Sequence, residues 1–400
     1  MSKKIAIATG TRADWGLLQP LAVRLRERGA DVAVMATHQH LMADMGDTIT
    51  EIIADGFTPA ASFPAAGDAP SIMAMAAAGA ADALRMLRPD AIVVLGDRCE
   101  MLGVASAALL SGVPVAHIAG GTVSEGAFDD SVRHAITKIA TLHFPETPLC
   151  ARRILQMGED PARVITTGAL GVENSMRLPL LDRHALAESL DGWDPGDNFL
   201  VVTLHAATLE GRVPLDVQRD MLDALASLPP TYRFILTYPN SDIDPRPLIE
   251  SLHEFERDMA PRVKVVASLG RVRYLSAVAL SRGVVGNSSS ALVETPSLGV
   301  GSLDIGMRQQ GRECGPAVIH CAADRESIAR GLQQLLSDSH RELAARRENP
   351  YAGASPADTM ADAILAFDLQ PFPIKHFRLL DPDRALTDSG PSLDRTSPER

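Results

Sequence analysis

The chain has 400 residues, of which 46% are hydrophobic and 4% aromatic, and its formal net charge is −12. This length predicts two domains, and the acidic balance argues against nucleic acid or an anionic membrane as the main partner. The four cysteines lack the spacing of a metal site. The chain begins with strand-like residues that leave no room for a signal peptide, and no apolar run approaches the ~20 residues of a membrane span. We therefore expect a cytoplasmic protein.

Short apolar runs alternate with amphipathic stretches along the chain, which is typical of parallel sheets with crossover helices. In the first half we expect strands at residues 5–8, 32–36, 91–95, 113–118 and 164–166, and helices at residues 17–27, 72–87, 101–110 and 132–141. After a linker-like segment at residues 177–197, we expect strands at residues 200–204, 233–236, 263–266, 283–285, 301–303 and 318–320. Helices are predicted at residues 215–227 and 327–336.

The two series predict an α/β fold of two Rossmann-like domains, residues 1–177 and 178–354, with the ligand site in the cleft between them. Residues 355–370 are expected to form a last helix that crosses back to the first domain. Residues 371–400 are a polar tail, and residues 381–400 are expected to be disordered.

Two polar loops follow predicted strands of the first domain, at the edge where open α/β sheets bind ligands. In the first loop, Arg12 is a candidate phosphate clamp and Asp14 is expected to cap the next helix. In the second loop, Arg98 lies at the same edge, and Asp97 either caps a helix or moves a proton.

The densest polar stretch spans residues 117–138. Gly120 and Gly121 are expected to let the backbone approach a ligand closely. Asp129 and Arg133 are four residues apart, so on a helix they share a face, and His134 and Lys138 form a second such pair. The stretch is either a well-capped surface helix or an acid and a cation placed for proton abstraction beside a phosphate leaving group.

Residues 284–294 combine a strand end, a turn at Gly286 and three serines that lead into a helix expected at residues 291–298. Backbone N–H groups and hydroxyls of Ser288, Ser289 and Ser290 would converge there with the positive end of the helix dipole, so the stretch is either a phosphate site or a serine-rich loop that caps a helix. Glu294, one turn further on, is a candidate acceptor for ribose hydroxyls.

Other polar residues of the second half also follow strands. His205 comes directly after a predicted strand, and Asn240 follows the next strand by a few residues and is a candidate ligand of a base or sugar. Arg308 and Arg312 are candidates to close over a nucleotide diphosphate. For each of these groups the alternative is an ordinary structural residue or a solvated loop.

In combination these segments resemble the hydrolysing UDP-N-acetylglucosamine 2-epimerases of the branch that serves sialic-acid-type nonulosonate synthesis. The resemblance covers roughly residues 4–367 and rests on G-T-R-A-D-W-G-L-L, G-D-R, H-I-x-G-G…D-D-x-x-R-H-x-x-T-K, G-N-S-S-S…E and R-Q-x-G-R. It implies a GT-B architecture, a UDP-sugar bound between the domains, no cofactor or metal, and a homodimer.

The resemblance also implies a reaction and a set of roles. A carboxylate removes the C2 proton as UDP leaves, and water then adds to the 2-acetamidoglucal to give N-acetylmannosamine. The catalytic group would be Asp97, Asp129 and Arg133, with His205. The UDP-sugar ligands would be Arg12, Arg98, Asn240, Ser288, Ser289, Ser290, Glu294, Arg308 and Arg312.

The sequence departs from this family pattern at three positions. Thr122 and Ala119 stand where the branch or some of its members carry an acid, and Ala206 stands where proline normally follows the histidine. The missing acids leave Asp97 and Asp129 for acid–base chemistry. Three alternatives therefore stay open: the same chemistry on a UDP-2,4-diacetamido-trideoxy sugar, a GT-B glycosyltransferase, and an inactive UDP-sugar-binding homologue.

Overall fold

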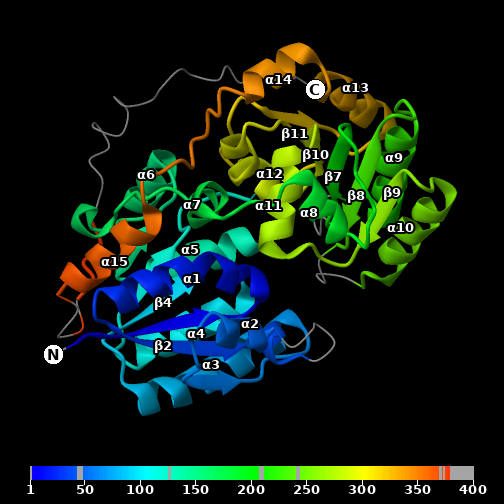
Figure 1. The fold of residues 1–400 in the computed structure, drawn as a ribbon. Coiled ribbons are helices and arrows are strands. Elements are labelled where there is room, and N and C mark those ends of the chain that lie inside the picture. The colour runs from blue at the N-terminus through cyan, green and yellow to red at the C-terminus, as the bar shows by residue number, and fades with distance from the viewer. Residues whose placement is uncertain are drawn as a thin grey trace, which may run out of the picture.

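The computed structural model describes residues 2–42, 48–124, 128–206, 211–239, 244–368, 372 and 374–378. Within them the chain forms two α/β units, each built on a six-stranded parallel sheet (Figure 1). The first sheet has the order β3-β2-β1-β4-β5-β6. Its strands are β1 (Lys4–Thr9), β2 (Asp31–Thr37), β3 (Ala61–Phe63), β4 (Ala91–Leu95), β5 (Val115–Ile118) and β6 (Leu142–Phe144).

The second sheet repeats this topology with the order β12-β11-β10-β7-β8-β9. Its strands are β7 (Phe199–Thr203), β8 (Arg233–Thr237), β9 (Val263–Val266), β10 (Gly283–Gly286), β11 (Ser302–Ile305) and β12 (Val318–Cys321). In each unit the strand order reverses beside the unit's first strand, between β1 and β4 and between β7 and β10. In doubly wound sheets, ligands bind beyond the carboxyl ends of the strands at this point.

Helices cover both faces of each sheet. Those of the first unit are α1 (Arg12–Glu27), α2 (Ile49–Ala54), α3 (Ala69–Leu87), α4 (Cys99–Leu110), α5 (Asp129–Ile139), α6 (Pro148–Gln156) and α7 (Leu170–Arg177). They are followed by α8 (Arg183–Glu188), α9 (Pro214–Ala226), α10 (Arg246–Asp258), α11 (Gly270–Leu280), α12 (Ser290–Val293), α13 (Arg325–Leu335), α14 (Asp338–Ala344) and α15 (Pro356–Ala366). None of the helices in the described part of the chain combines the length and apolar character needed to span a bilayer.

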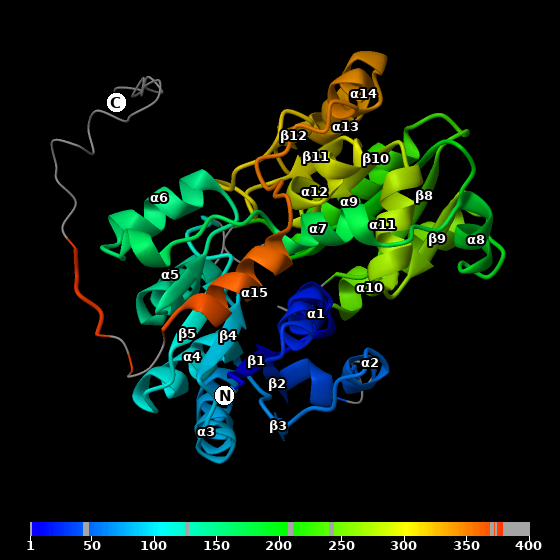
Figure 2. The same cartoon turned by 60° about the vertical axis from the view of Figure 1, so that its left-hand side comes forward.

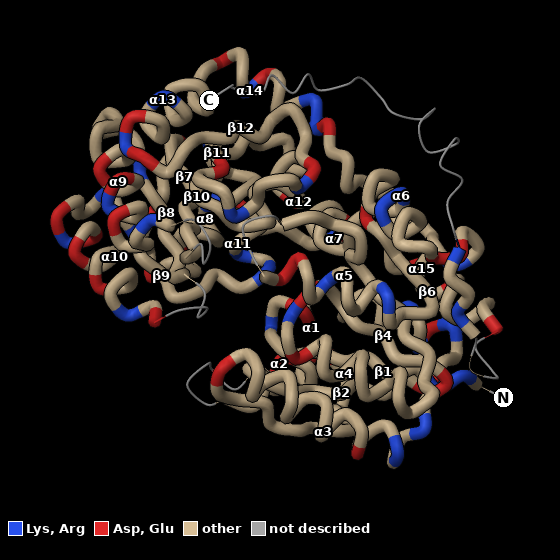
Figure 3. Tube along the Cα trace, turned by 180° about the vertical axis from the view of Figure 1, so that it is seen from behind, with Lys and Arg blue, Asp and Glu red and all other residues tan. Residues whose placement is uncertain are grey.

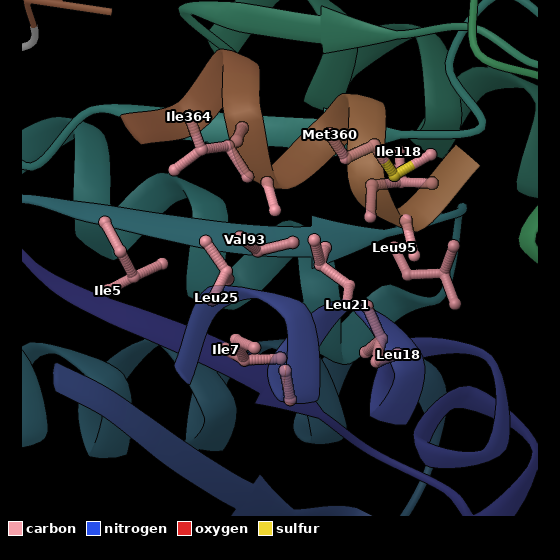
Figure 4. Close-up of a cluster of buried hydrophobic side chains, with 14 of the residues drawn as sticks. Ile5, Ile7, Leu18, Leu21, Leu25, Val93, Leu95, Ile118, Met360 and Ile364 are labelled. Carbon is pink, nitrogen blue, oxygen red and sulfur yellow. The ribbon is translucent and has the colours of Figure 1, made fainter. Parts of the chain in front are cut away.

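The last helix, α15, completes the core of the first unit, where it lies beside α1 (Figure 2). Met360 and Ile364 of α15 are fully buried with Ile7 of the sheet and Leu21 of α1 (Figure 4). The contact is also polar, because the guanidinium group of Arg28 lies 2.9 Å from Asp358 and 2.6 Å from Asp362. Helix α15 therefore belongs to the same packed core as β1 and α1.

The predicted α/β fold of two Rossmann-like units is confirmed, but three local predictions are wrong. Residues 164–166 form a single bridge from Val164 to His143, because only one residue pairs with the short edge strand β6. The predicted linker contains α8, whose first turn is capped by Asp182 through a 2.9 Å bond from the amide of Ala185.

The third difference is the helix predicted at residues 291–298. It is split into α12 and a 3₁₀ turn at Thr295–Leu298, where Pro296 lacks the N–H that an α-helix needs. The predicted domain boundaries stay predictions, and the tail predicted to be disordered at residues 381–400 lies outside the described residues.

We predict that Ile364→Ala destabilises the first unit by about 2–5 kcal/mol, because it leaves a cavity where α15 meets the sheet. The matched control is Met86→Ala, which removes a side chain that is 65% exposed and costs within about 0.5 kcal/mol. Urea unfolding followed by the fluorescence of the buried Trp15, with Trp193 replaced by Phe, reports on this core. Equal losses in the two variants would contradict the role assigned to α15.

Candidate active site

The loops after β1 and β4 meet at the switch point of the first sheet. Arg98 donates from Nε to the buried carboxylate of Glu100 at 2.5 Å. A Cβ atom on Gly10 would lie 2.4 Å from the same carboxylate, so glycine is needed for this close approach. Glu100 thus ties both loops together and holds the predicted UDP ligand Arg98 as its ion-pair partner.

Asp14 does not cap α1, contrary to prediction. Thr11 is the N-cap residue, and its hydroxyl accepts from the amide of Asp14 at 3.2 Å. The carboxyl group of Asp14 is buried, and its Oδ2 has no hydrogen-bond partner in the described part of the chain. Burial raises the pKa of Asp14 to about 6, although the charge of Arg98 opposes this.

Arg133 is the centre of the first-unit site, with only 1% of its surface exposed. Its guanidinium donates to the carbonyl of Thr122 at 2.8 Å, to Ser124 Oγ at 2.8 Å, to Asp130 Oδ1 at 3.3 Å and to the carboxylate of Asp97. It therefore joins α5 to the loops after β4 and β5.

Asp97 is held ionised by these surroundings. Burial alone would raise its pKa, but Arg133, Arg312 and Arg98 together outweigh burial and bring the pKa of this carboxyl below its usual value. Asp97 does not cap α4, whose N-cap residue is Arg98, without a side-chain cap.

Asp129, Arg133, His134 and Lys138 all lie on α5, as predicted. Arg133 also reaches Asp130 at i,i+3, and His134 Nε2 lies 3.4 Å from the other oxygen of Asp130. Lys138 pairs with Glu159, beyond α6. Asp129 lies half-buried in the first turn of α5, and its role in proton transfer stays a prediction.

The glycine pair after β5 serves internal packing, and its predicted close approach to a ligand stays a prediction. A Cβ atom on Gly121 would lie 2.3 Å from the carbonyl oxygen of Cys150 in α6, and one on Gly120 would lie 2.9 Å from Thr137 Oγ1 in α5. The glycines therefore let both helices pack against the strand end. Thr122, which follows them, is buried with its Oγ1 3.5 Å from Cys150 Sγ.

Glu146 lies at the same edge and was not among the residues predicted from the sequence. It is half-buried two residues beyond the end of β6, and Thr147, the next residue, donates a hydrogen bond to Glu313 of the second unit. Burial raises the pKa of Glu146 to about 7; Arg312 opposes the shift and Glu294 adds to it. The available signal was a lone glutamate directly after a buried strand.

In the second unit Gly286 is required by its backbone. It has a φ of 137°, and a Cβ atom there would lie 1.8 Å from the carbonyl oxygen of Thr203 in β7. The predicted turn at this residue is confirmed. It carries the chain from β10 to Asn287 at the second switch point.

Asn287 organises this switch point and was also missed by the sequence analysis. Its side chain accepts from the amide of His205 at 2.7 Å and donates to the carbonyl of His205 at 2.9 Å. Its own carbonyl accepts from Arg308 at 3.2 Å and from Gln309 at 2.9 Å. Burial, with a smaller effect of Arg308, lowers the pKa of His205 to about 3, so this imidazole is neutral at physiological pH.

The three serines follow directly. Ser288 and Ser290 are half-buried and Ser289 is exposed, and within the described residues their backbone N–H groups donate no hydrogen bond. Because α12 is one turn long, its dipole is much weaker than the predicted helix would provide.

Glu294 and Arg312 lie where the second unit faces the first. A Cβ atom on Gly171 of α7 would lie 2.2 Å from Glu294 Oε1. In the described part of the chain, Glu294 Oε2 and Arg312 Nε have no hydrogen-bond partner. Arg312 acts electrostatically on Asp97 as well as on Glu294, so its charge is shared between the units.

Arg12 bridges the units directly, since its guanidinium donates to Ser268 Oγ at 2.5 Å and lies 3.5 Å from Glu51. Asn240 lies outside the described residues.

Figure 3 shows acidic and basic positions interspersed over both units. The structure therefore brings the predicted residues other than Asn240 to the facing carboxyl edges of two sheets, with several of them held by protein partners.

Comparison with known proteins finds relatives over most of the chain. Residues 23–365 match a family model described as UDP-N-acetylglucosamine 2-epimerase. The polysialic acid biosynthesis protein P7 of Escherichia coli is 31% identical over 358 residues, which cover 87% of this chain and 90% of that protein. A GDP/UDP-N,N'-diacetylbacillosamine 2-epimerase (hydrolyzing) of Campylobacter jejuni is 33% identical over 78% of this chain and 83% of its own length.

Solved structures agree on the fold. The UDP-GlcNAc 2-epimerase of Neisseria meningitidis, determined bound to UDP-GlcNAc, has a TM-score of 0.76 at 18% identity and covers 91% of this chain and 100% of that chain. A putative UDP-N-acetylglucosamine 2-epimerase of Listeria monocytogenes has a TM-score of 0.76 at 17% identity and covers 95% and 100% of the two chains. The predicted GT-B-like architecture is confirmed.

We predict that Gly286→Ala is far more destabilising than Gly112→Ala. Both glycines have positive φ, but a Cβ atom on Gly112 meets nothing within 4 Å. Gly112→Ala should cost about 1 kcal/mol from backbone strain alone, whereas Gly286→Ala also pushes β7 away from β10. Thermal unfolding of the two variants measures the difference, and equal losses would contradict the packing described for Gly286.

Proposed function

Because the chain belongs to the UDP-N-acetylglucosamine 2-epimerase family and is a hydrolysing UDP-sugar 2-epimerase, we propose that its substrate is UDP-N-acetylglucosamine. The products are N-acetylmannosamine and UDP. UDP is eliminated to give 2-acetamidoglucal, and water then adds across the C1–C2 double bond. The proposed role is in nonulosonate biosynthesis, which the relation to the polysialic acid protein supports.

One observation carries this proposal: the buried Arg133 and the half-buried Asp97 form an ion pair at the switch point of the first sheet, within electrostatic reach of Arg312 from the second unit. Elimination moves negative charge onto the leaving diphosphate as the C2 proton is removed. Fixed guanidinium groups at that edge stabilise the developing charge without reorganisation, which is the largest contribution that such sites make.

The proposed ligands divide between the units. Ser288, Ser289 and Ser290 bind the diphosphate through hydroxyls and backbone N–H groups, and Glu294 binds the ribose. The neutral imidazole of His205 contributes one N–H donor to the diphosphate. The remaining proposed ligands of the nucleotide and diphosphate are Arg12, Arg98, Asn240, Arg308 and Arg312.

A second candidate substrate is a UDP-2,4-diacetamido-trideoxy sugar. It is supported by the 33% identity to a relative from Campylobacter jejuni that is described as acting on N,N'-diacetylbacillosamine nucleotides. Family membership favours an epimerase over the glycosyltransferase that the sequence left open. The cytoplasmic location and the homodimer stay predictions.

Proton NMR of the protein with UDP-N-acetylglucosamine in deuterated water tests the substrate. We expect free N-acetylmannosamine with deuterium at C2, released together with UDP. Turnover of the diacetamido nucleotide alone would establish the second candidate. UDP binding without turnover of either sugar would contradict the proposed activity and favour an inactive homologue.

We predict that Asp129→Asn lowers turnover by about 10²–10⁴-fold while UDP affinity changes little, because a general acid or base acts on the reacting proton and not on the nucleotide. The matched control is Asp82→Asn, which removes an exposed carboxylate of α3. Full activity of Asp129→Asn would remove this residue from the mechanism.

A further inference from the structure

A carboxyl group outside the family motifs faces the proposed sugar site. The side chain of Glu146 is half-buried beyond β6, and no group in the described part of the chain donates a hydrogen bond to it or forms an ion pair with it. The charged and titratable groups that act on it come from five segments of both units: Asp97, Arg133, Glu294, Arg312 and Tyr351. Even partial burial of a carboxyl group without such partners is unfavourable, which suggests that the group has a use at this site.

Glu146 lies at the carboxyl edge of the first sheet, close to Thr122, which stands where the family branch carries an acid. The ends of β5 and β6 are tied by a 3.1 Å bond from the amide of Ala119 to the carbonyl of Phe144. Thr122 packs on Cys150 in the first turn of α6, and Glu146 immediately precedes Thr147, the N-cap residue of that helix. The carboxyl group is therefore supplied from the neighbouring strand end.

The proposed reaction needs more than one proton-transfer group. Inversion at C2 requires that the proton leave from one face of the ring and return to the other, and one fixed carboxyl group serves only one face. Asp97 is a weak base, because Arg133, Arg312 and Arg98 stabilise its ionised form. If Asp129 serves one face of the ring, as proposed above, a further carboxyl group at this edge is needed for the other face.

We propose that Glu146 is a catalytic residue, the general base that removes the C2 proton of the UDP-sugar. The C2–H bond breaks, its electron pair forms the C1–C2 double bond, and the C1–O bond breaks with its electron pair leaving on UDP. The proton moves to the Glu146 carboxylate and later to solvent. In the hydration, water oxygen bonds to C1, an acid on the opposite face protonates C2, and the proton lost by water restores that acid.

The near-neutral pKa of Glu146, about 7, suits this task, since the best general base titrates near the working pH. The raised pKa also fixes the sign of the pH dependence. The base form increases as pH rises, so turnover should increase between about pH 6 and pH 8. Asp97, with its lowered pKa, cannot produce this limb of the profile.

This inference rests on the proposed function, and its first test is turnover of Glu146→Gln against pH. We expect at least a 100-fold loss of turnover and loss of the rising limb. Glu146→Asp should retain the limb with a smaller loss of turnover. Glu342→Gln, which removes an exposed glutamate of α14, should behave as wild type. The proposal would be overturned if Glu146→Gln kept wild-type turnover and the rise of turnover with pH. It would also be overturned if the loss of turnover in Glu146→Gln were explained by a lower melting temperature.

A second readout does not need turnover. Ionised Glu146 repels the diphosphate, so UDP affinity measured by calorimetry should fall between about pH 6 and pH 8 roughly threefold more in wild type than in Glu146→Gln. The comparison cancels the titration of UDP itself. Equal pH slopes would remove Glu146 from the site. If the slopes differ but wild type converts neither sugar, the proposed reaction fails while Glu146 stays at the nucleotide.

Discussion

The arrangement of the first-unit site depends on one buried cation. Arg133 is almost inaccessible to water, and a guanidinium in that position is stable only if its donors are satisfied. Its four acceptors come from α5 and from the loops after β4 and β5. Removing one partner of such a buried pair typically costs about 3–5 kcal/mol. The same charge therefore holds the loops together and keeps Asp97 ionised.

The second unit supplies charge that the first unit lacks. Arg312 acts on Asp97 and Glu146 across the domain boundary, and Glu294 opposes it from the same side. Neither sheet alone presents a complete set of cations and carboxyl groups. The strength of the electrostatic interactions among these side chains is therefore set by the relative position of the two units. Closure of the units around a substrate would change both the protonation of the carboxyl groups and the binding of the substrate.

Sequence patterns located the strands other than the three-residue edge strands β3 and β6, because buried parallel strands are short, continuous apolar runs. The first-domain loops after them were therefore assigned correctly to the carboxyl edge of the sheet, and the turn at Gly286 was predicted as well. Side-chain partners were harder to predict. Spacing correctly placed Asp129 and Arg133 on one helix, but it could not indicate that Arg133 also pairs with Asp97, which lies 36 residues earlier in the chain.

The residues that were missed depend on contacts between distant segments. Glu146 carries no motif, and its environment is created by groups from both units. Asn287 was noticed only as part of a serine-rich turn, although its side chain joins the loops after β7 and β10. The close approach at Gly121 similarly depends on α6, which the sequence analysis did not predict. Local propensity carries no information about such tertiary partners.

The packing of α15 has a consequence for synthesis of the protein. The two cores of the second unit draw on residues between Leu186 and Leu336, a continuous piece of chain, whereas the first core needs Met360 and Ile364 as well as Ile5. A ribosome that makes the chain from its N-terminus releases the second unit as a complete folding unit before the first one has its final helix. The first domain in sequence is therefore the last to close, the reverse of the usual N-terminal-first order.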